Sequence, residues 1–447
     1  MTSPAETIYA LASGRGRAGV AVLRVSGPDA ATAAQKLAGG VPAPRRAVLR
    51  RLRDLEGGAV LDDALAIFFK APASFTGEDV LELHVHGGRA VVDGVLAALG
   101  GLKGLRAAEP GEFTRRAFEN GRMDLTAAEG LNDLVQAQTA AQRLQALRQM
   151  DGALGALYER WRAELIDCLA LVEAEIDFSD EELPEDLTAN LGARIMALRG
   201  EIEAHLADSR RGERLREGVS AVILGPPNVG KSSLLNALAG RDAAIVSETA
   251  GTTRDVIEVA MDLGGYPVSL VDTAGLREAA EQVEAEGVRR ARERAERADL
   301  RLVMMEAAQW PEIPPEVAEV RENGTILVLN KCDRGGPPAG IVDGQQAVYA
   351  VSAATGAGLA TLLAALEARV AELCEITESP ALTRARHREA LVECVAALDR
   401  YAAQGACDRV LGAEDLRLAA RALGRITGRV DVEDLLDVIF SSFCIGK

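Results

Sequence analysis

The chain has 447 residues, of which 48% are apolar, so it is long enough for two or three domains and too apolar to be disordered. Its formal net charge of −17 disfavours nucleic-acid binding, and any RNA contact would need a local basic patch. None of the six cysteines forms a CxxC pair, which argues against a zinc site or a disulfide framework and is typical of a reducing cytoplasm. Because no segment has the pattern of a signal peptide or a membrane span, we expect a cytoplasmic protein without membrane contact.

The first 121 residues alternate apolar runs with helical stretches and predict an α+β domain. The predicted strands are Val20–Val25, Ala64–Phe69 and Val80–Val85, and the predicted helices are Ala30–Leu37 and Ala90–Leu99. His84 and His86 are expected to point to opposite sides of the third strand and to hold no metal.

From residue 122 to 217 the apolar residues recur at helical spacing. One predicted face carries Leu131, Leu134, Val135, Gln138, Leu144 and Leu147, and a second helix runs from Leu157 to Ile176. Helical periodicity returns in 375–447, through Ala390–Tyr401, Ala413–Leu423 and Val432–Phe440. A segment of about 70 residues can hardly form a stable core alone. We therefore interpret the two parts as one discontinuous all-α domain, against the alternative of two small separate ones.

Residues 218–374 alternate strands and helices, which predicts a doubly wound α/β domain inserted between the helical halves. The predicted strands are Ser220–Gly225, Val268–Asp272, Leu300–Met305, Thr325–Asn330 and Ala347–Ser352.

The first of these strands leads into GPPNVGKS, Gly225 to Ser232, and then into a helix, which is the setting of a phosphate-binding loop. Its glycines let backbone N–H groups point at phosphate, Lys231 supplies charge, and Ser232 binds magnesium. The GTP contacts predicted here are Asn228, Val229, Gly230, Lys231, Ser232 and Ser233.

Two further motifs complete the predicted phosphate and magnesium site. Asp272, Thr273, Ala274 and Gly275 form DTAG at a strand end, where Asp272 holds magnesium through water and the Gly275 N–H contacts the γ phosphate. In the segment before that strand, Thr253 is placed to complete the magnesium shell. The GTP contacts predicted in this segment are Ser247, Glu248, Thr249, Ala250, Gly251, Thr252 and Thr253.

The base is chosen by Asn330, Lys331 and Asp333 of NKCD, with Ser352, Ala353 and Ala354 as the companion loop. A carboxylate at Asp333 accepts from guanine N1–H and the exocyclic amine, whereas adenine would leave it buried and unpaired. We therefore predict GTP rather than ATP as the substrate.

Leu276 stands where Ras-type enzymes place the glutamine that orients water, so hydrolysis must use another group. The candidates are Arg277, Glu278, Glu281 and Glu284, each of which can equally be a solvated side chain on a helix face. Positive charge for the transition state can come from Arg254, a partner chain or a bound cation. Asn228 can ligate a monovalent ion, or it can be an ordinary turn residue.

Taken together, these motifs resemble the bacterial tRNA modification GTPase family MnmE (TrmE). The likeness covers GPPNVGKSSLLNALAGRDAAIVSETAGTTRD, DTAGLRE and NKCD, the ending IFSSFCIGK, and the N-terminal runs GVAVLRVSG, SFTGEDVLELHVHGG and PGEFTRRAFENGRMDLTAAEG. The resemblance implies a folate-binding, dimerising N-terminal domain and G domains that dimerise when potassium is bound. It also implies a homodimer that forms a heterotetramer with the flavoprotein MnmG (GidA). This complex adds an aminomethyl-type group to carbon 5 of the wobble uridine of certain tRNAs, using 5-formyl-tetrahydrofolate or a related tetrahydrofolate.

The family's site residues carry over by position. Asn228, Ser247, Thr249 and Thr252 match the potassium site, and Glu284 matches the water-orienting glutamate, which acts with Lys231 and Thr253 in catalysis. The folate contacts implied are Arg24, Glu82, Lys447 and Arg122, the last standing where the family often has lysine. The resemblance also places Cys444 near the folate as a possible reactive thiol.

Two other functions compete with this one. The first is an RNA-binding switch of the Era or Der type, which would carry a KH domain or a second phosphate loop. The second is a scaffold that GTP hydrolysis only resets. The basic clusters 45–53, 210–216 and 289–301 are candidates for RNA contact, with no choice made among them.

Overall fold

The computed structural model describes residues 6–55, 57–177, 190–207, 209–240, 258–272, 298–320, 324–375, 380–405, 408–430 and 433–446. The chain divides into two compact units. The first comprises Met1–Asn132, Gln149–Asp177 and Ala413–Lys447, and the second comprises Asp133–Arg148 and Phe178–Gly412. The predicted domain boundaries at residues 122, 218 and 375 lie inside these units and stay a prediction.

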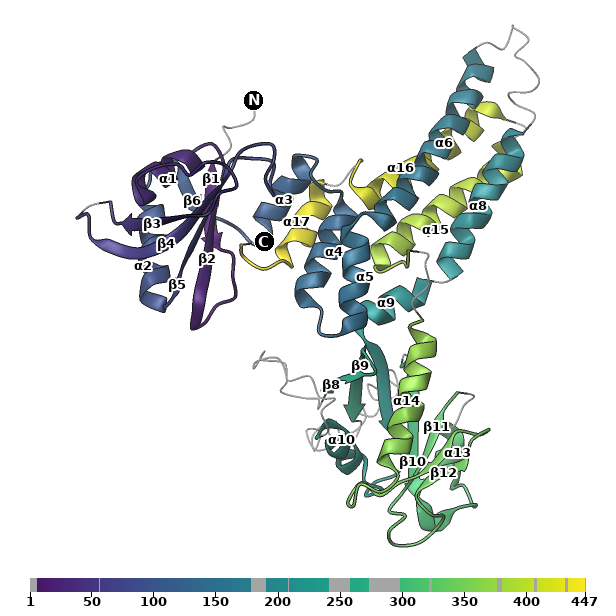
Figure 1. The fold of residues 1–447 in the computed structure, drawn as a ribbon. Coiled ribbons are helices and arrows are strands. Elements are labelled where there is room, and N and C mark those ends of the chain that lie inside the picture. Colours follow the sequence, from purple (N-terminus) through teal and green to yellow (C-terminus); the bar gives the residue numbers. More distant parts are fainter. Residues whose placement is uncertain are drawn as a thin grey trace, which may run out of the picture. The chain divides into compact units, whose positions relative to one another are not determined.

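The first unit contains a six-stranded sheet in the order β3-β4-β5-β2-β1-β6, in which only the β1–β6 pair is parallel (Figure 1). Its strands are β1 (Thr7–Leu11), β2 (Ala18–Ser26), β3 (Val48–Arg53), β4 (Val60–Phe69), β5 (Val80–Gly87) and β6 (Leu105–Ala107). Helices α1 (Ala30–Ala38) and α2 (Arg89–Gly100) pack on it. The α+β prediction is confirmed, and the sequence pattern missed β1, β3 and β6.

Alternation along β2 and β5 separates the two faces of this sheet. Leu23, Val25, Leu81 and Leu83 are buried in the core that α1 and α2 cover. The intervening residues point to the other face, because side chains on a strand alternate with a period of two. His84 and His86 are two residues apart and therefore share that face, so the expectation that they point to opposite sides is wrong.

The helical part of the first unit joins segments that are far apart in sequence. It contains α3 (Glu112–Glu119), most of α4 (Leu125–Gln136), α6 (Ala153–Asp177), most of α16 (Arg409–Thr427) and α17 (Glu433–Ser441). Thr427 Oγ1 donates to Glu159 Oε1 at 2.6 Å, which ties α16 to α6 (Figure 1). Segments on both sides of the α/β insert thus share one unit.

The face predicted from Leu131 to Leu147 is interrupted, because α4 ends at Gln136 and α5 (Ala140–Met150) starts a new helix. A capping box marks the restart: Thr139 Oγ1 accepts from the Gln142 N–H at 3.3 Å, and Gln142 Oε1 accepts from the Thr139 N–H at 3.1 Å. Val135 and Leu144 are exposed rather than buried. The sequence does contain the capping-box pattern T-x-x-Q at this point, whereas the prediction of one continuous face relied on apolar spacing alone.

The second unit contains a seven-stranded sheet in the order β12-β13-β11-β10-β7-β9-β8. One face of it packs a core with α10 (Lys231–Ala239) and α14 (Leu359–Leu373), and the other packs one with α13 (Pro315–Val320). This arrangement is the predicted doubly wound fold. Its strands are β7 (Val219–Leu224), β8 (Glu258–Leu263), β9 (Tyr266–Asp272), β10 (Leu300–Glu306), β11 (Ile326–Asn330), β12 (Gly340–Asp343) and β13 (Val348–Ala350).

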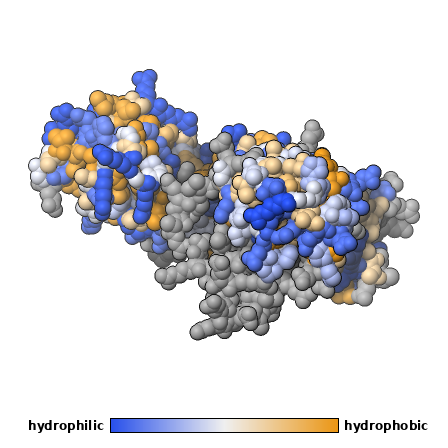
Figure 2. All heavy atoms as spheres, turned by 90° about the horizontal axis from the view of Figure 1, so that it is seen from below, coloured by the Kyte–Doolittle hydropathy of each residue, from blue (hydrophilic) through white to orange (hydrophobic). Residues whose placement is uncertain are grey.

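The rest of the second unit is helical: most of α5, α8 (Leu191–Ala207), α9 (Ser209–Glu217), α15 (Ala385–Arg400) and the short η1 (Ala307–Gln309) and η2 (Tyr401–Gly405). Helix α15 packs on α8. Among the described residues, no helix is long and apolar enough to cross a membrane. Hydrophilic and hydrophobic residues are interspersed on the face drawn in Figure 2.

Candidate functional site

The phosphate loop lies between β7 and α10, and its backbone conformation requires glycine at two positions. Gly225 has φ 144°, and a Cβ there would lie 2.5 Å from the Met304 carbonyl oxygen of β10. Gly230 has φ 100°, and a Cβ there would lie 2.4 Å from Asn330 Nδ2. Both positions combine a left-handed backbone with a close approach, so an alanine would strain the loop and collide with its neighbour.

Lys231 begins α10 and is 8% exposed. Its ammonium group donates to the carbonyl oxygens of Gly225 and Pro226, at 3.0 and 2.9 Å. A buried positive charge at the N-terminus of a helix, inside a curled loop, is the arrangement that binds phosphate. Ser232 follows in the first turn and is exposed, so its hydroxyl can reach a metal ion.

The base motif is joined directly to the phosphate loop. Asn330 is 2% exposed, its Nδ2 donates to the Val229 carbonyl at 2.8 Å, and its Oδ1 accepts from the Ala353 N–H at 3.1 Å. Lys331 Nζ donates to the Asn228 carbonyl at 2.8 Å and pairs with Glu306 of β10. Asn330 therefore joins the base motif to the phosphate loop and to the loop at Ala353.

Asp333 is held as a carboxylate. A hydrogen bond from the Ser352 side chain lowers the pKa of the Asp333 carboxyl below its usual value of 3.8. Ser352 is fully buried, and its Oγ also accepts from the Thr355 N–H at 3.2 Å. The charged carboxylate can accept two hydrogen bonds from the N1–H and amine edge of guanine.

The magnesium site is consistent with the register of the sheet. Ile223 of β7 pairs with Asp272 at the end of β9, so Asp272 lies beside the strand that leads into the phosphate loop. Magnesium prefers oxygen ligands and is usually completed by phosphate and water, which suits a site that offers the Ser232 hydroxyl. The predicted contacts that lie outside the described residues are Ser247 to Thr253, Thr273, Ala274, Gly275 and Glu284.

The first unit holds a second polar cluster, on the sheet face away from α1 and α2. Arg24 and Glu82 are register partners on β2 and β5, and Arg24 donates to Glu82 Oε1 through Nη2 at 2.9 Å and Nε at 3.1 Å. The guanidinium also lies 5.2 Å from the ring centre of Phe75 and 5.7 Å from that of Phe113. Neither aromatic residue was predicted, because only the fold brings them to Arg24.

The C-terminal tail packs beside this cluster. Gly446 has φ 94°, and a Cβ there would lie 2.2 Å from the Leu11 carbonyl at the end of β1, whose Ala10 pairs with Arg24. Cys444 is exposed, and its carbonyl accepts from the Gly111 N–H at 3.4 Å. Arg122 is exposed, while Lys447 lies outside the described residues.

Fold and site together define a multidomain P-loop protein that carries a G domain. Two family descriptions match the chain: "GTP-binding protein TrmE N-terminus" over residues 7–122 and "MnmE helical domain" over residues 125–444. The chain belongs to the tRNA modification GTPase MnmE family.

Relatives match over nearly the full length. The chain is 62% identical to the tRNA modification GTPase MnmE of Parvibaculum lavamentivorans, covering 99% of this chain and 100% of that one. It is 50% identical to the mitochondrial 5-taurinomethyluridine-[tRNA] synthase subunit GTPB3 of Danio rerio, covering 99% and 93%. A solved structure of an Aquifex aeolicus Era variant bound to GDP.AlF4- matches 40% of this chain and 66% of that one at 25% identity, with a TM-score of 0.24.

Proposed function

We propose that this protein hydrolyses GTP and, with the flavin-dependent partner MnmG (GidA), adds an aminomethyl-type group to carbon 5 of the wobble uridine of certain tRNAs. The observation that carries the proposal is the full-length match to relatives named tRNA modification GTPase, combined with a phosphate loop and base motif that hold each other in place. GTPB3 is named as a subunit of a synthase, which supports a partner protein. In the described residues after 380 the elements are helical, which does not favour the KH domain of an Era-type switch.

The proposed hydrolysis relies on charge and on water positioning. Lys231 neutralises the phosphates, while magnesium, held by Ser232, Thr253 and Asp272, supplies further charge when it is bound. Glu284 orients the attacking water, because Leu276 cannot form that hydrogen bond.

The proposed potassium site is formed by Asn228, Ser247, Thr249 and Thr252. Asn228 adopts a left-handed backbone with φ 60°, and Lys331 holds its carbonyl oxygen. This conformation fixes the direction of the Asn228 Cα–Cβ bond within the loop, which supports a role as an ion ligand. Potassium bound there supplies the positive charge that a finger arginine gives in other GTPases.

The Arg24–Glu82 cluster is the proposed site of the tetrahydrofolate that supplies the one-carbon unit. A pterin ring carries an amide N–H next to an exocyclic amine, the donor pair that a carboxylate such as Glu82 accepts. Phe75 is partly buried and provides aromatic surface at the Arg24 guanidinium, which suits a planar ring, while the fully buried Phe113 packs against the same guanidinium from within the fold. Arg122, Lys447 and Cys444 are proposed to line the same site.

The proposed homodimer uses the sheet face on which Glu82 lies. Leu49, Leu65, His84 and Val22 form one row across β3, β4, β5 and β2 on that face. Leu65 is 44% exposed and Leu49 is 67% exposed. Two exposed leucines side by side on a sheet support burial against a second copy.

Nucleoside analysis of tRNA tests the function. Cells without the gene should lack the carbon-5 group on the wobble uridine, and the wild-type gene should restore it. Glu284→Ala should lower GTP turnover by on the order of 10² to 10⁴ while GTP still binds, and should not restore the modification. Glu281→Ala is the matched control. Restoration by Glu284→Ala would show that hydrolysis is dispensable and would favour the scaffold function.

Potassium dependence tests the Asn228 assignment. GTP turnover should be on the order of 10² faster in potassium chloride than in sodium chloride of equal ionic strength, because the ion offsets developing negative charge. Asn228→Gly keeps the left-handed backbone accessible while removing the ligand, so it should bring the potassium rate down to the sodium rate. Equal rates of the wild type in the two salts would rule out the potassium site.

Dimerisation can be tested at Leu65. Leu65→Lys should raise the dimer dissociation constant at least about 30-fold, because it would bury a charge in an apolar interface. Sedimentation equilibrium at low salt without GTP measures this constant. Ile341→Lys, on an exposed residue of β12, is the control. A dimer that tolerates Leu65→Lys must use another surface.

A further inference from the structure

Three segments of the second unit meet at one place, which we call the arginine junction: residues 140–148 of α5, the helix α9, and residues 381–388 at the start of α15. Helix α5 reaches α9 through Gln142 Nε2, which donates to the Arg216 carbonyl at 2.9 Å, and Gln145 Nε2, which donates to the Gly212 carbonyl at 3.2 Å. On its other side, α9 is so close to residue 382 that a Cβ on Gly212 would lie 2.3 Å from the Leu382 carbonyl.

The arginine junction is strongly basic within an acidic chain. Its three segments hold nine arginines and only two acidic residues, Glu213 and Glu217, whereas the whole chain carries −17. Carboxylates from outside also pair with it, among them Asp133 with Arg384 and Asp299 with Arg214, both at 2.7 Å. The three segments themselves carry seven more positive than negative charges. The nine are Arg143, Arg148, Arg210, Arg211, Arg214, Arg216, Arg384, Arg386 and Arg388.

Part of this positive charge is exposed to solvent. Arg143 and Arg148 of α5 and Arg210 of α9 are exposed side chains. Guanidinium groups that lie close together repel one another, which destabilises the folded protein. A bound polyanion removes this repulsion and is the usual ligand of such a cluster.

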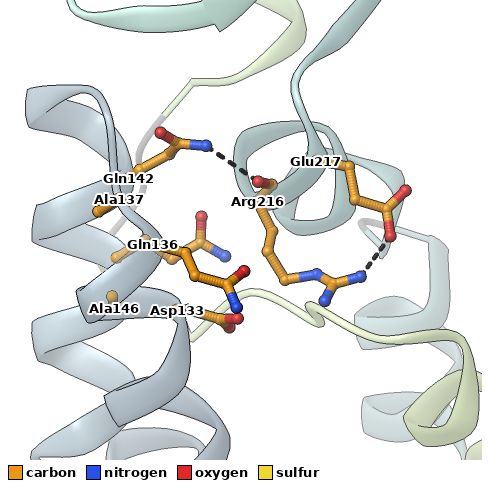
Figure 3. A pocket seen from close by; sticks show the side chains of 8 residues that line it. Asp133, Gln136, Ala137, Gln142, Ala146, Arg216 and Glu217 are labelled. Atoms are coloured by element: carbon orange, nitrogen blue, oxygen red, sulfur yellow. Dashed lines mark hydrogen bonds and ion pairs between the residues drawn. The ribbon is translucent and has the colours of Figure 1, made fainter. Parts of the chain in front are cut away.

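A polar pocket of about 310 Å³ opens between α5 and α9 (Figure 3). Gln145 Oε1 and Arg216 Nε are buried there without a hydrogen-bond partner. Burial of a polar atom without a partner is unfavourable, so each of these two atoms favours a ligand that completes its hydrogen bonding. One is an acceptor and the other a donor, which matches a hydroxyl group, since a hydroxyl donates and accepts at once.

We propose that the arginine junction binds the ribose–phosphate backbone of tRNA. The arginines neutralise phosphates, and the pocket receives a ribose 2′-hydroxyl, the group that distinguishes RNA from DNA. The inference rests on the proposed function for its choice of tRNA over other polyanions. The carboxylates of an acidic protein surface only accept hydrogen bonds, so these charged groups could pair with Arg216 Nε but not with Gln145 Oε1.

The test is the salt dependence of tRNA binding, measured by fluorescence anisotropy with unmodified tRNA. The double variant Arg143→Glu with Arg210→Glu should lose about 10- to 100-fold in affinity, and the slope of log affinity against log salt should fall by about 1–2. The control double variant is Arg15→Glu with Arg89→Glu, two exposed arginines of the first unit that lie outside the three basic clusters. GTP turnover without tRNA should be unchanged in both, since neither pair lies in the nucleotide site.

The role of the pocket is tested separately, by the preference of the protein for RNA over DNA. Wild-type protein should prefer an anticodon stem-loop made of RNA over the same sequence made of DNA, and Gln145→Leu should reduce that preference. Polyglutamate should compete poorly with tRNA at equal charge.

The outcomes separate this inference from the proposed function. Equal losses in the two double variants would mean that only net charge matters, and full competition by polyglutamate would indicate a protein-binding surface; either result overturns the inference. An absence of tRNA binding by the wild type would overturn it as well. In all three cases nucleoside analysis still decides the proposed function independently.

Discussion

Replacing Asp333 with asparagine should lower the affinity for GTP by on the order of 10⁴ and allow xanthosine triphosphate to bind. The carboxylate accepts from both N1–H and the exocyclic amine of guanine. Asparagine replaces one acceptor with a donor, which would face the guanine amine. Xanthine carries a carbonyl oxygen at that position and restores the match. The Ser352 side chain forms a hydrogen bond with Asp333, so we expect the amide of an asparagine at this position to occupy the same place as the carboxylate.

Competition between labelled and unlabelled nucleotides measures both affinities. Asp343→Asn is the control, because Asp343 is an aspartate of the same unit whose carboxylate accepts from the backbone of Gln345 and Gln346. Since the pKa of Asp333 lies below 3.8, its contribution is present above that value and is lost only as the pH falls through the lowered pKa. GTP affinity of the wild type should therefore not fall between about pH 8 and pH 5 because of this group. Unchanged affinities in Asp333→Asn would show that another residue reads the base.

The strands of the G domain were predictable because each is an apolar run bounded by polar residues. Observed β10 and β11 differ from the predicted strands by one residue at one end, and β7 differs by one residue at each end. The edge strands β3 and β12 were missed for a physical reason: an edge strand is half solvated, and β3 carries three arginines that suggested a surface patch instead. The break between α4 and α5 was missed because the apolar spacing continues across it.

The motifs of the nucleotide site were predictable from the sequence, whereas the contacts that each of their residues makes were not. The sequence pattern assigned Asn330 to GTP, yet both polar ends of its amide are used within the protein. Glu306, which pairs with Lys331, and Phe75, which lies at Arg24, had no motif to mark them. Such contacts join residues far apart in sequence, so they follow from the packing of strands and loops rather than from spacing.

The arginine junction was likewise only partly predictable from the sequence. The run 210–216 was visible as a basic cluster, but α5 contributes Arg143 and Arg148 and the start of α15 contributes three more arginines only once the chain is folded. The basic cluster at residues 45–53 belongs to the first unit, where Arg51 of β3 pairs with Asp63 of β4 at 2.8 Å.

Lys231→Met should remove GTP hydrolysis while leaving the nucleotide-free protein as stable as the wild type or more so. The ammonium group is buried and donates to two carbonyls of its own loop, and taking a charge out of water carries a desolvation cost. Methionine has a similar length and no charge, so the folded protein loses little. The γ phosphate, in contrast, loses the charge that stabilises its transfer, which lowers turnover by on the order of 10² to 10³.

Thermal unfolding with and without GTP separates the two effects. At a GTP concentration about 1,000 times the dissociation constant, ligand binding stabilises the wild type by about 4 kcal/mol, and Lys231→Met should lose much of this gain at the same concentration. Lys36→Met, on an exposed lysine of α1, should change neither quantity. If Lys231→Met destabilised the empty protein but kept the gain from GTP, Lys231 would be a structural residue of the loop. If Lys231→Met instead left the empty protein as stable as the wild type and lost the gain from GTP, Lys231 would be a phosphate-binding residue. Its burial would then be unfavourable for folding and favourable for binding GTP.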